Sequence, residues 1–119
     1  MEKWVSICSV EDIAPNVGVC ALVEGKQVAV FNDARSGQLY AISNYDPIGK
    51  ANILSRGIIG TIEGEPYVAS PLYKQHFHLA TGACLEEPQH SIETFGLKVE
   101  AGQIFVAAKE LAPTAQAVA

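Results

Sequence analysis

Hydrophobic and polar residues alternate over short stretches of this chain, a pattern typical of β-strands separated by turns. The predicted strands cover residues 4–8, 18–23, 26–31, 38–42, 58–62, 67–69, 75–79, 95–99 and 104–107. Three of the turns between them are Glu24-Gly25, Glu63-Gly64 and Ala101-Gly102. Because glycine readily adopts the positive φ that two-residue turns require, each of these pairs predicts an antiparallel hairpin.

Individual residues add detail to this pattern. In the strand 26–31, the alternate pairs Val28/Val30 and Ala29/Phe31 are both apolar, which predicts a central strand buried on both faces. In the strand 95–99, Leu97 and Val99 are expected to point inward, with Lys98 and Glu100 outward. Ser9 precedes Val10-Glu11-Asp12 and is placed to cap a single helical turn.

The middle of the chain is less regular and the end is rich in alanine. Residues 43–57 have no clean period and predict a structured loop region, and residues 43–88 together predict a small inserted subdomain with its own hairpin. Residues 108–119 lack the large apolar groups needed to dock and predict a flexible tail. The sequence shows no internal repeat. We therefore expect one domain over residues 1–107, an all-β antiparallel sandwich or small barrel.

Composition and charge limit the possible partners. The chain has 119 residues, 8 basic and 13 acidic side chains and a net charge of −5, which argues against binding nucleic acid or an anionic membrane surface. It contains no apolar run of the roughly 20 residues that a membrane-spanning helix needs. Its first residues do not resemble a secretory signal, and its three widely spaced cysteines do not resemble a disulfide framework. These features predict a cytoplasmic protein.

The three cysteines carry no marked chemistry. They form no Cys-x-x-Cys pair, so the usual cysteine spacing of a metal site is absent. Cys8 and Cys20 lie on apolar strands and are expected to be buried and inert, whereas Cys84 is expected to lie in an exposed loop. No basic residue neighbours Cys84, so a redox role is not favoured.

Two histidines two residues apart are the first candidate metal ligands. His76 and His78 would share one face of a strand, where a third ligand, His90 or Cys84, could complete a site. The alternative is that both are partly exposed polar residues flanking a buried Phe77, and this alternative is favoured because no other ligand has a supporting spacing.

A nucleophilic site could be assembled from Ser70, His76 and Asp46. Such triads form in three dimensions, so their separation in the sequence does not exclude one. No Gly-x-Ser-x-Gly turn surrounds Ser70, however, and nothing else marks its hydroxyl as activated. The residues alone therefore indicate a binding or structural module without a visible active site.

Three segments in the middle of the chain resemble the Rieske ferredoxin domain. They are Tyr40-Ala41-Ile42-Ser43-Asn44 leading to Asp46-Pro47-Ile48, then Val68-Ala69-Ser70-Pro71-Leu72-Tyr73, then Phe77-His78-Leu79-Ala80-Thr81-Gly82. The resemblance extends over most of the chain, roughly from Val5 to Ala107. It implies a Rieske-like fold, in which two Cys/His pairs hold a [2Fe–2S] cluster.

All four cluster ligands of that family are replaced here. Asp46 and Ser70 stand at the cysteine positions, and Ile48 and Tyr73 stand at the histidine positions. Isoleucine has no donor atom, and the other three offer only oxygen, a poor match for an iron–sulfide cluster. We expect no cofactor, metal or catalytic residue on this chain. We expect Ile48 and Tyr73 to fill part of the vacated space, with the Tyr73 hydroxyl donating a hydrogen bond to Asp46 or to the backbone.

A chain that keeps the Rieske-like scaffold but lacks the cluster ligands resembles the small subunit of assimilatory NAD(P)H-dependent nitrite reductase. This resemblance implies a non-catalytic, cytoplasmic subunit that assists the assembly or stability of a large subunit. That large subunit carries FAD, an iron–sulfur cluster and sirohaem, and reduces nitrite to ammonium in nitrate assimilation. The alternative from the same fold is a [2Fe–2S] electron-transfer ferredoxin with atypical ligation.

The tip formed by the two former ligand loops is the candidate interface with the large subunit. Its apolar residues are Ile48, Ile53, Leu54, Leu72 and Tyr73. An apolar tip on a small domain indicates a protein contact. The equally weighted alternative is that these side chains pack beneath the loops.

Overall fold

The computed structural model describes residues 3–107, and this part of the chain is all-β, as predicted. Its strands are β1 (Trp4–Ser9), β2 (Gly18–Val23), β3 (Lys26–Asp33), β4 (Gln38–Ser43), β5 (Tyr45–Asp46), β6 (Ala51–Asn52), β7 (Ile58–Ile62), β8 (Glu65–Ala69), β9 (His76–His78), β10 (Thr94–Phe95), β11 (Leu97–Glu100) and β12 (Gln103–Ala107). Three short 3₁₀ helices join them: η1 (Val10–Asp12), η2 (Leu54–Arg56) and η3 (Pro88–His90). No helix within residues 3–107 is long and apolar enough to cross a membrane.

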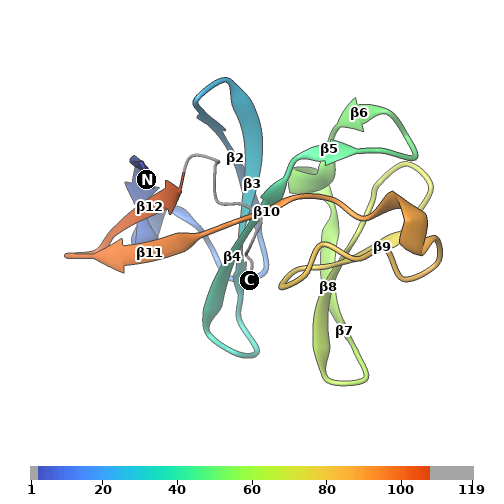
Figure 1. Ribbon diagram of the computed structural model, residues 1–119. Coiled ribbons are helices and arrows are strands. Elements are labelled where there is room, and N and C mark those ends of the chain that lie inside the picture. Colours follow the sequence, from blue (N-terminus) through green and yellow to red (C-terminus); the bar gives the residue numbers. More distant parts are fainter. Residues whose placement is uncertain (1–2, 108–119) are drawn as a thin grey trace.

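The strands form four antiparallel sheets. One has the order β1-β12-β11, the central one β10-β4-β3-β2, and the other two are β5-β6 and β7-β8-β9. Figure 1 shows the β11–β12 sheet on one side of the central sheet and the strands β5–β9 on the other. The strands β5–β9 and their connecting loops therefore form a half of the molecule separate from the terminal strands.

The central strand β3 is buried on both faces, as its sequence predicts. Val28 and Val30 point into a first core, between the central sheet and the β1-β12-β11 sheet. Ala29 and Phe31 point into a second core, shared with the β5–β9 half. Successive side chains of a strand alternate between faces, so one strand supplies both cores.

The second core joins the β5–β9 half to the central sheet. It contains the buried side chains Ala29, Phe31, Ile42, Leu54, Val68, Phe77, Leu79 and Cys84. The helix η2 approaches β2 so closely that a Cβ at Gly18 would lie 2.5 Å from the carbonyl oxygen of Ser55. Glycine at this position is what allows η2 to reach the central sheet.

The three predicted hairpin turns are confirmed. Both turn residues have positive φ in each case, from 49° at Glu24 to 86° at Gly25. This is the conformation whose twist matches that of the flanking strands. The predicted helical turn is also confirmed: Ser9 Oγ accepts a hydrogen bond from the N–H of Glu11 at 3.3 Å.

One predicted strand is divided between two sheets. Residues 95–99 were predicted to be continuous, but Phe95 pairs with β4, and Leu97 begins the pairing of β11 with β12. Val99 is 44% exposed rather than inward, because β11 is the edge of its sheet. The predicted flexible tail, residues 108–119, lies outside the described residues.

Candidate functional site

Two short loops form the candidate site, one after β5 and one after β8. In the first loop, residues 46–50, Asp46 Oδ1 accepts hydrogen bonds from the N–H groups of Ile48 at 2.8 Å and Gly49 at 3.0 Å. The carbonyl oxygen of Asp46 accepts the N–H of Lys50 at 2.6 Å. Asp46 therefore closes the first loop with both its side chain and its backbone.

The second loop, residues 70–74, repeats this arrangement. Ser70 Oγ accepts the N–H of Leu72 at 3.3 Å, and the carbonyl oxygen of Ser70 accepts the N–H of Lys74 at 3.1 Å. Each loop ends on a lysine with positive φ, 59° at Lys50 and 65° at Lys74. The segments Asp-Pro-Ile-Gly-Lys and Ser-Pro-Leu-Tyr-Lys therefore fold alike.

A buried hydrogen bond ties the two loops together. Ser70 Oγ donates to Asp46 Oδ2, and the two residues are 1% and 0% exposed. The carboxylate of Asp46 thereby accepts three hydrogen bonds, which offset the cost of removing it from water. The two positions where the Rieske pattern has cysteines are thus joined directly.

Only part of the expected filling of the loops is observed. Ile48 is half-buried and packs against the second core. Tyr73 is 64% exposed, and the partner of Asp46 is Ser70, so the predicted role of Tyr73 is wrong. Close approach of the loops replaces it: a Cβ at Gly49 would lie 2.6 Å from Leu72 Cδ1.

One residue of the predicted interface with the large subunit is not at the surface. Leu72 is 49% exposed and Ile53 is half-buried, so both remain accessible along with Tyr73. Leu54 is fully buried in the second core, and its placement at the interface is wrong. The physical reason is that η2 turns Leu54 beneath the central sheet, where its burial contributes about 1.5–3 kcal/mol.

The donor atoms of the two loops do not fit a [2Fe–2S] cluster. Such a cluster takes thiolate and imidazole ligands, and none of the four positions has either. Asp46 and Ser70 are already hydrogen-bonded to each other, Ile48 has no donor, and Tyr73 points its large side chain to the surface.

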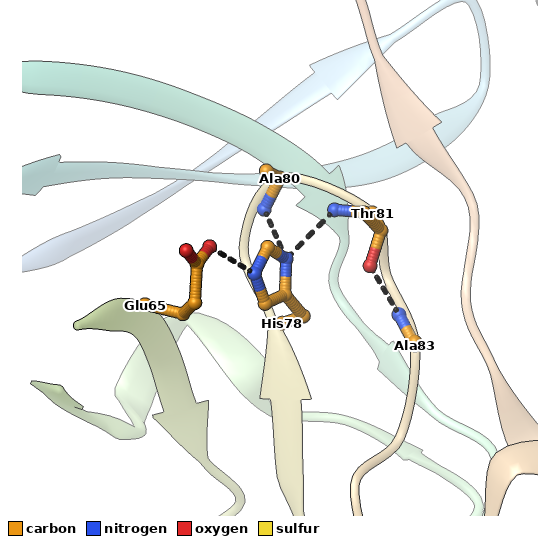
Figure 2. A network of polar contacts seen from close by, with 5 residues as sticks. All are labelled: Glu65, His78, Ala80, Thr81 and Ala83. Atoms are coloured by element: carbon orange, nitrogen blue, oxygen red, sulfur yellow. Dashed lines mark hydrogen bonds and ion pairs between the residues drawn. The ribbon is translucent and has the colours of Figure 1, made fainter. Parts of the chain in front are cut away.

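His78 is held by backbone groups on one side and a carboxylate on the other (Figure 2). Its Nδ1 accepts the N–H groups of Ala80 at 3.2 Å and Thr81 at 3.1 Å. The ring proton therefore lies on Nε2 and is donated to Glu65 Oε1 at 2.8 Å. Thr81 Oγ1 continues the network by accepting the N–H of Ala83 at 3.2 Å. His78 thus shapes the turn after β9.

The other two histidines face different carboxylates. His76 Nδ1 lies 2.6 Å from Glu86 Oε2, and His90 Nε2 lies 3.8 Å from Glu87 Oε1. The structure therefore does not bring His76, His78 and His90 together as a ligand set. Within residues 3–107, no three His, Cys, Asp or Glu residues are grouped so that they could hold a metal ion.

The residues of the hypothetical nucleophilic site do not form a triad, because Ser70 and His76 are hydrogen-bonded to different carboxylates. The Ser70 hydroxyl donates a hydrogen bond to Asp46, whereas the His76 ring is hydrogen-bonded to Glu86. Burial raises the pKa of the Glu86 carboxyl, but hydrogen bonds from the N–H and the ring of His76 outweigh it. The net pKa lies below its ordinary value of 4.5. His76 is therefore occupied by an ionised partner and does not serve as the base of Ser70.

Two of the three cysteines, Cys20 and Cys84, are placed opposite to expectation. Cys84 is 1% exposed because its backbone forms an isolated β-bridge with Phe77 inside the second core. Cys20 is exposed on β2. Burial raises the pKa of the Cys84 thiol above its ordinary value. Burial, with the charge of Asp12 second, also raises the pKa of the half-buried Cys8. The thiol expected in an exposed loop is thus a buried one.

Comparisons with known proteins agree with this geometry. The family model described as the Rieske-like [2Fe-2S] domain matches residues 3–107. The nitrite reductase (NADH) small subunit of Salmonella typhimurium is 47% identical over 104 residues, which cover 87% of this chain and 96% of that protein. The solution structure of the Escherichia coli protein NirD is 43% identical, with a TM-score of 0.85, over 92% of this chain and 100% of that one.

A third relative is a much longer protein. A nitrite reductase NAD(P)H large subunit of Klebsiella oxytoca is 37% identical over 115 residues, which cover 96% of this chain and 12% of that protein. The segment equivalent to this chain is therefore part of a longer polypeptide in that relative. Identity, coverage and fold together show that this chain belongs to the family of nitrite reductase NAD(P)H small subunits, with a Rieske-like domain.

Proposed function

We propose that this chain is a non-catalytic subunit that assists the assembly or stability of the nitrite reductase large subunit, without holding a [2Fe–2S] cluster. The observation that carries the proposal is the buried hydrogen bond between Asp46 and Ser70. It joins the two positions where the cluster-bearing pattern has thiolates. The loops are thereby held in place by protein groups alone, and the scaffold does not need a cluster to close them.

The Klebsiella relative supports physical association with a large subunit. There, a segment similar to almost the whole of this chain is part of a protein named as the large subunit. A covalent link keeps two domains at a high effective concentration, so even a weak contact between them is populated. We infer that the separate chain makes the corresponding contact through its own surface.

The tip of the two loops is the proposed contact surface. Leu72 and Tyr73 are large and exposed, Pro71 before them is also exposed, and Ile53, in the segment that follows the first loop, is half-buried. Exposed apolar groups gathered on loops indicate a protein partner. Burying the two larger side chains would contribute to association through the hydrophobic effect.

The absence of a disulfide among the described residues supports a cytoplasmic setting. Cys8, Cys20 and Cys84 are all free, and Cys20 is exposed. Free thiols persist in a reducing compartment, whereas secreted small domains commonly depend on disulfides. We propose that the chain works in the cytoplasm with the FAD- and sirohaem-containing partner that the resemblance implies.

Association with the large subunit tests the proposal. The chain is expected to co-purify with its large subunit, and the double variant Leu72→Asp/Tyr73→Asp is expected to weaken this association at least roughly tenfold. Leu22→Asp is the matched control, because Leu22 is 69% exposed but lies on β2. A chain that does not bind the large subunit contradicts the proposal. A double variant that binds as well as the control contradicts the assignment of the tip.

The electron-carrier alternative makes a different prediction for the same complex. If the chain passed electrons through its own cluster, replacing Tyr73 with Asp would change electron flow without requiring a loss of association. An iron-free chain that still raises the amount or stability of assembled large subunit supports the proposed role instead.

A further inference from the structure

We propose that a hollow beside the second loop receives an acidic side chain of the large subunit, held between Arg56 and Lys74. This inference rests on the proposed function, since it names the chemistry of the partner at the same tip. The hollow lies where the start of β7 meets the end of β8, next to Ser70. Besides the two cations, Ile58, Ala69 and Pro71 line it.

The two cations of the hollow have no partner within the described chain. Among residues 3–107, Lys3, Lys26 and Lys98 form ion pairs with carboxylates, whereas Arg56 and Lys74 form none. Both side chains are therefore free to meet a negative charge from outside. The side chain of Lys50, at the end of the first loop, is likewise without an ion pair in this part of the chain.

The local charge is opposite to that of the whole protein. The chain carries a net charge of −5, yet residues 47–58 and 71–75 contain no aspartate or glutamate. The one carboxylate of the loops, Asp46, is buried and hydrogen-bonded. The two loops and η2 therefore carry Lys50, Arg56 and Lys74 without an exposed carboxylate of their own, and charge complementarity favours an acidic partner surface. The carboxylate of Glu86 is itself hydrogen-bonded to His76, which pairs with Ala69.

The hydrogen-bonding groups of the hollow favour a partner's side chain over a small free anion. Backbone N–H groups are the usual cradle for phosphate, but those lining the hollow are used internally. The N–H of Gly57 bonds to Leu54 O, that of Ser70 to Gln75 O, and that of Lys74 to Ser70 O. Only the flexible side chains of Arg56 and Lys74 remain to bind an anion.

An exposed apolar residue lies at the same place. Ile58 is 77% exposed and lines the hollow together with Arg56. Apolar residues beside an arginine are typical of protein interfaces, where the apolar part excludes water around the charged contact. Pro71 also lines the hollow and directly precedes the exposed Leu72 and Tyr73 in the second loop, so the hollow adjoins the proposed contact surface, and this commits the inference to the large subunit as the occupant.

Charge reversal tests the inference. The double variant Arg56→Glu/Lys74→Glu is expected to weaken binding to the purified large subunit roughly tenfold at low ionic strength, about 1.4 kcal/mol. The difference is expected to shrink at high salt, because screening weakens exposed charge pairs. Arg35→Glu is the matched control, since Arg35 lies in the turn between β3 and β4 and also forms no ion pair among residues 3–107.

The outcomes separate this inference from the proposed function. If wild-type chain binds the large subunit and the double variant binds like Arg35→Glu, the hollow does not receive an acidic group, while the proposed function stands. If wild-type chain does not bind at all, both are overturned.

Inorganic phosphate tests whether the hollow is instead a site for a small anion. If millimolar phosphate shifts the NMR signals of Arg56 and Lys74 but displaces no large subunit, the hollow is a small-anion site and the inference is wrong. Unchanged thermal melting of the variant shows that any loss of binding is not unfolding.

Discussion

The two faces of the central sheet lead to halves of the molecule that are organised differently. On the first-core side, Val28 and Val30 pack against the sheet of the terminal strands, in which β11 and β12 are joined by a tight hairpin. On the second-core side, the sheets are short, and the loops that follow β5 and β8 are joined by the buried Asp46–Ser70 contact. Apolar alternation is enough to build the first half, whereas a few polar groups position the second. The half with the less regular sequence is also the one that carries the proposed surface.

Removing Phe31 is expected to have the largest effect, because it breaks the link between the halves. Phe31 is fully buried in the second core, and Phe31→Ala should lower the free energy of unfolding by about 3–5 kcal/mol. Urea unfolding followed by circular dichroism measures this loss. The fluorescence of Trp4, the single tryptophan, reports on the first half. Coincident transitions by both probes would show that the halves unfold as one unit, and separate transitions would show that they do not.

The Asp46–Ser70 contact can be compared with a second buried carboxylate, Asp33, at the end of the central strand β3. Asp33 is 3% exposed and accepts bonds from the N–H of Arg35 and the hydroxyl of Ser36, all within one hairpin. Asp46→Ala is expected to cost about 3 kcal/mol, since it leaves three donors unpaired. Asp33→Ala should cost less, because its donors lie nearer the surface.

Hydrogen exchange distinguishes the two variants further. In Asp46→Ala, the amides of Ile48 and Gly49 lose their acceptor and should exchange faster, while the amides of β3 and β4 remain protected. In Asp33→Ala, faster exchange should be limited to Arg35 and its neighbours. Equal stability of Asp46→Ala and wild type would contradict the role given to this contact.

The smallest expected effect concerns pH and lies at the edge of the second half. The pKa of Glu86 is lower in the folded protein than its ordinary value, so its ionised form stabilises the fold at higher pH. That contribution disappears as the pH falls through the folded pKa. Since the side chain is 42% exposed, solvent screening limits it to a few tenths of a kcal/mol. Glu86→Gln should remove this part of the acid dependence in melting curves taken below pH 4.5, and an unchanged profile would contradict it.

The sequence predicts the first half better than the second for physical reasons. Strands of five or six residues, such as β1 and β12, show a period of two, and the Ala101-Gly102 turn requires a conformation that few residues adopt readily. Strands β5 and β6 have two residues each, too few to show a period. The burial of Leu54 and Cys84 depends on contacts with distant strands, which alternation does not encode.

The site itself was predicted in position but not in its contacts. The resemblance placed Asp46 and Ser70 at former ligand positions, yet they are 24 residues apart, and nothing local indicates that they bond to each other. One signal was available: Asp-Pro-Ile-Gly-Lys and Ser-Pro-Leu-Tyr-Lys share proline and lysine at the same spacing. Comparing these two segments would have predicted two loops of the same form.

Iron and acid-labile sulfide assays, with a visible absorption spectrum of the same purified sample, test the central claim most directly. Because Asp46 and Ser70 bond to each other and Ile48 has no donor, we expect a folded, colourless chain with no significant iron or sulfide. Stoichiometric iron and sulfide with the visible absorption of a [2Fe–2S] cluster would contradict the claim, and electron transfer would then become the leading function.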